Sequence, residues 1–146
     1  MSRIALVLVL ACGCADFVPD VGEPLVDRCV NEDGDPSSPV LFGRDIQAGI
    51  IQAVNRCLPC HEPGGDNALG FDIGGLDLTT YTGVRAGGTN GPGAIVPGRP
   101  CDSILLQKLS AGPPFGSRMP LNGPPFLGPD ELRLVHDWIA EGALDN

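Results

Sequence analysis

One short motif constrains this chain more than any other feature. Cys57-Leu58-Pro59-Cys60-His61 has the CxxCH spacing of covalent haem attachment. Two thiols three positions apart can form thioethers with the two vinyl groups on one edge of a porphyrin. The imidazole that follows can then ligate the iron through Nε2. The motif predicts one haem c, bound by Cys57, Cys60 and His61.

Two other kinds of site use a CxxC pair. A zinc site would need further ligands, and the remaining candidates, Cys101 and His136, are unpaired and far apart in the sequence. A thioredoxin-like redox site would need a βαβ pattern, which is absent around the motif. Haem attachment is therefore the favoured interpretation.

Composition independently supports a bound cofactor. The 146 residues have room for one modest domain. They include five Phe, one Tyr and one Trp against 21 Gly and 15 Pro, so a core made of side chains alone would be thin. A buried haem would supply the missing apolar mass.

Residues 1–14 have the pattern of an export signal with a lipoprotein box. One arginine precedes an apolar run, residues 4–11, that is too short to span a bilayer. The small residues around Cys12 and Cys14 resemble a bacterial lipoprotein box, and Cys12 fits it better as the lipidated residue. An ordinary secretory signal without lipid is the alternative.

Cysteine parity favours Cys14 instead. Cleavage before Cys14 would leave Cys57 and Cys60 for haem, with Cys29 and Cys101 as one possible disulfide. Either cleavage predicts an exported protein in the periplasm or cell envelope, lipid-anchored to a membrane. Disulfides persist there, and bacteria attach haem c there.

Residues 15–43 are predicted to form an acidic flexible tether, and residues 44–146 the haem domain. The tether contains seven acidic residues, one arginine and four prolines, with little periodicity. Its alternative is that part of it folds back onto the domain through a bond between Cys29 and Cys101.

Apolar spacing predicts helices in the haem domain. They cover residues 44–58, running straight into the motif, 79–85, a segment capped by Asp102 or Ser103, and a stretch from Gly128 to Gly142. Trp138 is expected to cross the first helix at Gly49. Four residues are expected either to line a haem crevice or to form ordinary core: Leu76, Leu78, Tyr81 and Val84.

Met119 is the predicted second axial ligand. Apart from Met1 it is the only methionine, and it lies in a proline-rich loop where no packing role is evident. A thioether is a soft ligand that suits haem iron opposite a histidine and raises the reduction potential. His136 is the rival ligand, although it lies beside the apolar face of the last helix.

An ordered set of segments resembles the single-haem class I cytochrome c domains of planctomycete-type and related myxobacterial lipoproteins. The segments are Phe42-Gly43-Arg44-Asp45-Ile46, CLPCH, Gly74-Gly75-Leu76-Asp77-Leu78, Ile95-Val96-Pro97-Gly98, Ser103-Ile104-Leu105, Arg118-Met119-Pro120 and Trp138-Ile139-Ala140-Glu141-Gly142-Ala143. The resemblance implies an all-α fold around one haem, with long Gly/Pro-rich loops. It also implies His61 and Met119 as iron ligands and Cys57 and Cys60 as thioether sites.

Cys101 departs from the pattern of that family, which suggests its bond to Cys29. The function expected from the resemblance is electron transfer without catalysis. Residues 44–146 carry 11 acids and seven bases, 7 − 11 = −4, so a redox partner with a basic docking surface is expected and nucleic acid is not. The alternatives are a haem subunit of a redox enzyme, such as a peroxidase or a dehydrogenase complex, and a haem-based sensor.

Overall fold

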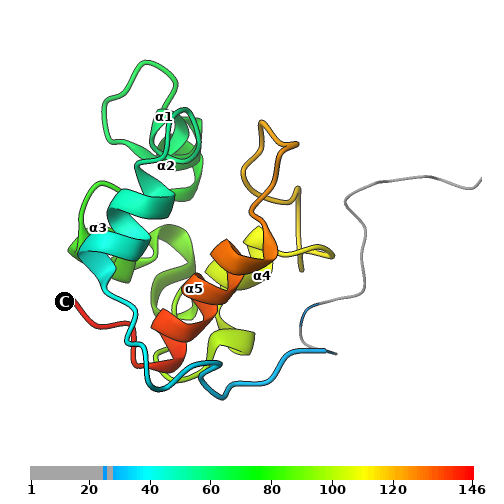
Figure 1. Ribbon diagram of the computed structural model, residues 1–146. Coiled ribbons are helices and arrows are strands. Elements are labelled where there is room, and N and C mark those ends of the chain that lie inside the picture. Colours follow the sequence, from blue (N-terminus) through cyan, green and yellow to red (C-terminus); the bar gives the residue numbers. More distant parts are fainter. Residues whose placement is uncertain (1–24, 26–27) are drawn as a thin grey trace, which may run out of the picture.

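The computed structural model describes residue 25 and residues 28–146. The predicted export signal, Cys12, Cys14 and the first part of the predicted tether lie outside the described residues. The described part is all-α, without a strand (Figure 1). Its helices are η2 (Phe42–Ile51), α1 (Leu58–His61), α2 (Leu69–Gly74), α3 (Tyr81–Ala86), η3 (Gly88–Gly93), η4 (Pro100–Asp102), α4 (Ile104–Leu109) and α5 (Pro129–Ala140).

Helix α5 organises the core. Its buried face presents Val135, Trp138 and Ile139, each at most 2% exposed. The Trp138 ring lies 5.4 Å from the ring of Phe42, which begins η2, and Phe42 meets Tyr81 edge-on at 5.1 Å. The predicted C-terminal helix is confirmed, with Pro129 in its first turn.

Helix η2 begins and ends earlier than predicted. It starts at Phe42 rather than Arg44 and ends at Ile51, so it does not run into the motif. Helix η2 is a π-helix, and at its end the Gln52 N–H donates to the Gln47 carbonyl, five residues back. The chain then turns, with Asn55 at a φ of +56°. Val54, which lies within the predicted helix, is 89% exposed.

The crossing of η2 and α5 was predicted at the wrong residue. A Cβ added to Gly49 would meet only the Arg44 carbonyl oxygen, at 3.3 Å, so none of the described helices approaches closely there. Trp138 packs instead on Phe42, one end of η2. The contact is aromatic and does not require a glycine.

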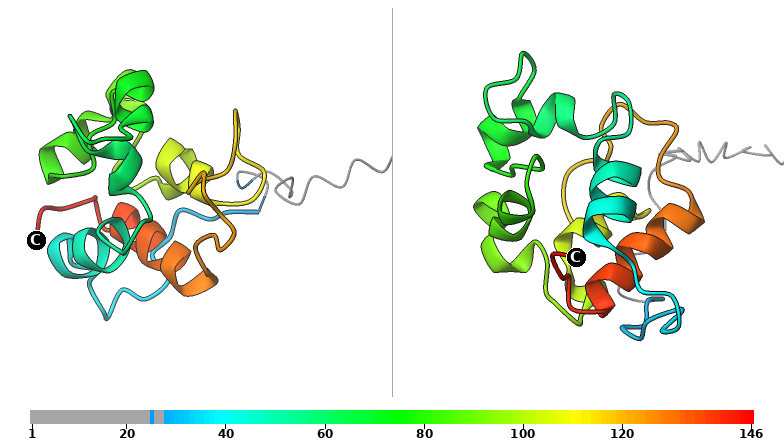
Figure 2. Two further views of the ribbon diagram at one scale, coloured as in Figure 1. Left: turned by 90° about the horizontal axis from the view of Figure 1, so that it is seen from above. Right: turned by 60° about the vertical axis from the view of Figure 1, so that its left-hand side comes forward.

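The two shorter predicted helices are present, but only one of them has a side-chain cap. The Thr80 hydroxyl accepts from the Gly83 N–H at the start of α3, and Gly87, at φ +72°, ends it. Ser103 precedes α4, but its hydroxyl caps no helix N–H; it accepts from Val96 N and donates to Arg99 O. Figure 2 shows the green elements together on one side of the molecule and the yellow segment from α4 onward on the other.

Residues 28–41, here called the N-terminal strap, pack on the domain. They belong to the predicted tether, yet they pass beneath α5 in Figure 1. Val40 is 3% exposed, and its N–H donates to the Glu141 carboxylate. The Gly34 N–H donates to Asp137 Oδ1 at 2.9 Å. The domain therefore extends at least to residue 28.

A disulfide fastens the strap at its start. The Sγ atoms of Cys29 and Cys101 are bonded, and the two Cα atoms lie 5.7 Å apart. The Cys101 N–H also donates to Asn31 Oδ1 at 3.0 Å.

In the part of the chain described here, none of the helices has the length and hydropathy to cross a membrane.

Candidate haem site

Helix α1 presents the CxxCH motif. It is a single turn, with Pro59 near its start, and the N–H groups of Cys60 and His61 both donate to the Cys57 carbonyl, at 3.2 and 3.1 Å. Both motif thiols are unbonded and half-buried. This turn keeps the two sulfurs and the imidazole within one short, locally hydrogen-bonded segment.

Burial is the main influence on the Cys57 thiol. It raises the pKa of that thiol to about 11, and the neighbouring Cys60 adds to the shift while Arg56 opposes it. Cys57 is therefore a protonated thiol at neutral pH, which disfavours thiol redox chemistry, because that chemistry needs the thiolate.

The imidazole of His61 is oriented by a backbone carbonyl. Its Nδ1 lies 3.1 Å from the Leu76 oxygen, and the His61 carbonyl accepts from the Leu78 N–H at 3.0 Å. A carbonyl can only accept, so Nδ1 carries the proton of that bond. The lone pair is then on Nε2, where an iron ligand needs it.

Gly70 contributes to the site and was not singled out from the sequence. A Cβ at this position would lie 2.6 Å from both Cε1 and Nε2 of His61 and 2.8 Å from the Cys60 carbonyl oxygen. Helix α2 therefore passes the imidazole at a distance that only glycine allows. The available signal was a glycine inside a helix, which often marks close approach.

Met119 lies in the loop between α4 and α5, and that loop is tied back to α4. The Met119 N–H donates to the Lys108 carbonyl at 2.8 Å, and Arg118 Nε donates to the Leu109 carbonyl at 2.9 Å. The Asn122 side chain reaches the Asn55 carbonyl at 2.8 Å, which links this loop to the segment before the motif.

Met119 has a packing role that was not evident from the sequence. Its half-buried side chain packs against the hydrophobic core, as do Cys57 and Leu76. Each of these three residues therefore lies at the edge of the core. Of the four residues with two expected roles, Leu78 and Val84 are buried core, while Leu76 and Tyr81 lie at this margin.

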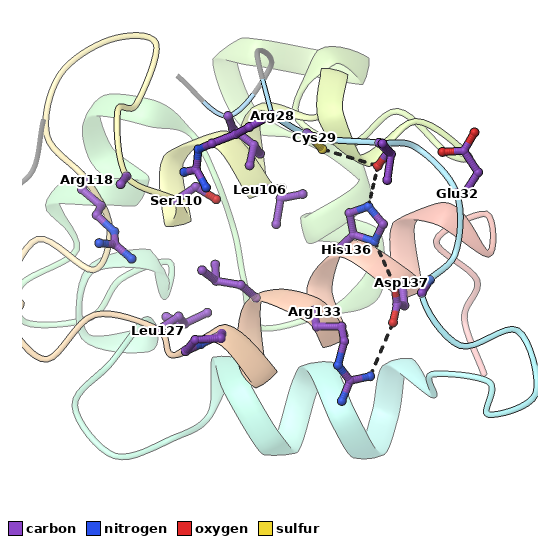
Figure 3. Close-up of a pocket in the computed structure, with 16 residues that line it drawn as sticks. Arg28, Cys29, Glu32, Leu106, Ser110, Arg118, Leu127, Arg133, His136 and Asp137 are labelled. Carbon is purple, nitrogen blue, oxygen red and sulfur yellow. Dashed lines mark hydrogen bonds and ion pairs between the residues drawn. The ribbon is translucent and has the colours of Figure 1, made fainter. Parts of the chain in front are cut away.

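His136, the rival ligand, lies elsewhere on the domain. Its Nδ1 is 2.8 Å from Asp137 Oδ1 and its Nε2 is 2.7 Å from the Val30 carbonyl oxygen of the strap. Figure 3 shows its ring between the strap and α5. Because both ring nitrogens already have partners, the structure gives no support to a bis-histidine haem.

An ion pair joins the motif to α5. The Arg56 guanidinium, directly before Cys57, contacts the Glu131 carboxylate. Burial alone would raise the pKa of Glu131, but the Gly128 N–H and Arg56 outweigh it and hold that pKa below its ordinary value.

The residues present fit a c-type haem. Two unbonded thiols stand at the required spacing, and the bond from Nδ1 of the histidine leaves the ring lone pair on Nε2. Residues 57–120 match the planctomycete cytochrome C family. Neither the curated proteins nor the solved structures gave a match. The matched segment, which runs from the motif to the residue after Met119, is therefore similar to a cytochrome c-type domain.

Proposed function

We propose that this protein carries electrons through one covalently attached haem c, with His61 and Met119 as axial ligands of its iron. The observation that carries the proposal is the Nδ1 to Leu76 carbonyl bond of His61, within a CxxCH motif of a cytochrome c-type domain. The bond leaves Nε2 as a ligand to iron. Haem-based electron transfer is the chemistry that a cytochrome c domain suggests.

Each of the named residues has one role in this proposal. Cys57 and Cys60 hold the porphyrin as thioethers, and the Leu76 carbonyl fixes the His61 ring. Met119 supplies the second axial ligand. Its backbone N–H and the side-chain Nε of Arg118 hold the loop against α4. The bound haem supplies one-electron exchange between Fe(II) and Fe(III).

The axial ligands can be tested by optical spectroscopy. Protein expressed with a haem-attachment system is compared, oxidised and reduced, with Met119→Ala. We expect a covalent low-spin haem whose weak sulfur-to-iron band at the red end is lost in Met119→Ala. The matched control is Leu121→Ala, which removes an exposed side chain from the same loop and should leave the spectrum unchanged.

Two other results would change the conclusion. A high-spin wild type that binds carbon monoxide readily has an open sixth position, which would favour a redox-enzyme subunit or a haem-based sensor. A wild type without covalent haem would overturn the proposed function altogether.

The partner and location are part of the same proposal. The acidic balance of residues 44–146 favours a redox partner with a basic docking surface. Electron exchange with a small basic redox protein should slow as salt is added, because screening weakens the attraction.

The protein is proposed to be exported and lipid-anchored through Cys12, or alternatively Cys14. Mass spectrometry of its N-terminal peptide would distinguish the two sites.

A further inference from the structure

A second cluster of ligand-type side chains lies away from the CxxCH motif. It consists of Cys29 on the strap, Cys101 in η4 and His136 on α5. Their ligand atoms, two Sγ and a ring nitrogen, all lie within 4.8 Å of one another. Figure 3 shows His136 pointing from α5 toward the strap at Cys29. The cluster joins three segments that are distant in the sequence.

The His136 ring is oriented as zinc-binding histidines are. Its Nδ1 faces the carboxylate of Asp137, which is 2% exposed. A carboxylate on one ring nitrogen holds the proton there and presents the other nitrogen to a metal. Here the other nitrogen, Nε2, faces the carbonyl of Val30, next to Cys29.

Asp137 is incompletely satisfied by its protein partners. Its Oδ1 accepts from the Gly34 N–H and faces His136, whereas its buried Oδ2 accepts no hydrogen bond within the described residues. The Arg133 guanidinium lies 3.6 Å from Oδ2. A bound cation on the far side of the imidazole would increase the positive charge that this buried carboxylate faces.

We propose that reduction of the Cys29–Cys101 disulfide opens a zinc(II) site whose ligands are Cys29, Cys101 and His136. A dithiol supplies two electrons and two protons: its own sulfurs form a disulfide, the Cys29–Cys101 bond breaks, and two thiols result. Zinc then displaces both thiol protons and the proton on His136 Nε2. The fourth position takes water, as in other sites with three protein ligands.

The separations suit this exchange. Tetrahedral zinc with Zn–S bonds of about 2.3 Å places two sulfurs about 3.7 Å apart. The Cα atoms of Cys29 and Cys101 are 5.7 Å apart, so the reduced side chains have only to rotate away from each other. Because Val30 adjoins Cys29, freeing that cysteine also lets the carbonyl move off Nε2.

The proposal differs from a purely structural role for the same residues. A disulfide with a histidine and an aspartate behind it would hold the strap in place without any metal. The zinc site adds that the strap stays fastened after reduction, with the metal replacing the S–S bond. This inference does not depend on the proposed electron transfer.

Zinc uptake tests it on the full chain. Haem-loaded protein is used, because its Cys57 and Cys60 are then thioethers. A resin-bound dithiol reduces it and is removed, and the protein is dialysed against Zn²⁺ alone. We expect one zinc per reduced chain and none per oxidised chain. His136→Ala should weaken binding at least tenfold, and Glu32→Ala, which removes a nearby exposed carboxylate, should not.

X-ray absorption at the zinc edge supplies a readout that does not depend on a variant folding. Two sulfur neighbours at about 2.3 Å and one nitrogen neighbour would support the site. Absence of uptake by the reduced wild type, or zinc with only nitrogen and oxygen neighbours, would overturn it. If no haem attaches, the same measurement on a Cys57→Ser/Cys60→Ser background keeps the two proposals separate.

Discussion

The two sides of this domain differ in how far protein side chains alone complete them. Around α5, Val135, Trp138 and Ile139 are buried almost fully, and the disulfided strap covers the helix. Helices α1 and α2 contain no buried residue, and Ile73 is 78% exposed. The α5 side therefore has a core made of its own side chains. The α1–α2 side has hydrogen bonds and a predicted haem-attachment motif, and an apolar cofactor would complete its packing.

The comparison predicts its largest effect at Trp138. Trp138→Ala should lower the free energy of unfolding by about 3–5 kcal/mol, because it empties the centre of the core. Ile73→Ala, on α2, should change it by less than about 0.5 kcal/mol. Denaturant titration of both variants measures the contrast. Equal losses would mean that the two sides share one core.

Withholding the haem should affect the two sides unequally. In Cys57→Ser/Cys60→Ser, the amides of α1 and α2 should lose roughly a hundredfold in hydrogen-exchange protection, because the packing mass against them is missing. Amides of α5 should keep their protection. Mass-spectrometric exchange on the full chain, with and without haem, resolves this. Collapse of protection in α5 as well would contradict the division.

Gly70 tests how tightly α2 approaches the motif. Gly70→Ala should destabilise the haem-loaded protein by about 1–3 kcal/mol, because the new methyl would overlap the His61 ring. Gly74→Ala is a matched control in the same helix, where an added Cβ meets nothing within 4 Å. If both variants lose the same stability, the cause is the helix rather than the imidazole.

The smallest expected effect comes from removing the Arg56–Glu131 ion pair, which joins the two sides. Because the pKa of Glu131 is lowered below 4.5 on folding, its contribution is full above that value and is lost as pH falls through the lowered pKa. Glu131→Gln should therefore cost less than about 1 kcal/mol at neutral pH and nothing in acid. A double-mutant cycle with Arg56→Ala, at both pH values, isolates the pair. A cost that persists in acid would point to lost packing instead.

The sequence was sufficient where signals are local. Helix α5 was predictable because a strong apolar period begins at Gly128-Pro129 and ends near Gly142. The CxxCH spacing of Cys57, Cys60 and His61 is also a local signal, and their roles at a haem stay predictions. The end of η2 was missed because the apolar spacing continues as far as Cys57, whereas the helix ends at Ile51.

Long-range contacts account for the remaining differences. The strap has the acidic composition of a solvated tether, but it is held by Asp137 and Glu141, more than a hundred residues further along the chain. Gly70 approaches His61 only because α2 folds back onto α1. Neither proximity is encoded in a local pattern. Ligation of the iron by Met119 stays a prediction, although the loop that carries it is well fixed.

The disulfide also bears on how the chain matures. The disulfide joins Cys29 to Cys101, 72 residues further along the chain, and Cys57 and Cys60 lie within the loop that it closes. If these four thiols oxidise before haem is attached, they can pair in three ways, and each way consumes both haem thiols. A chain with one bond keeps both of them only when that bond is Cys29–Cys101. Early formation of the Cys29–Cys101 bond would therefore leave the Cys57 and Cys60 thiols free for haem attachment.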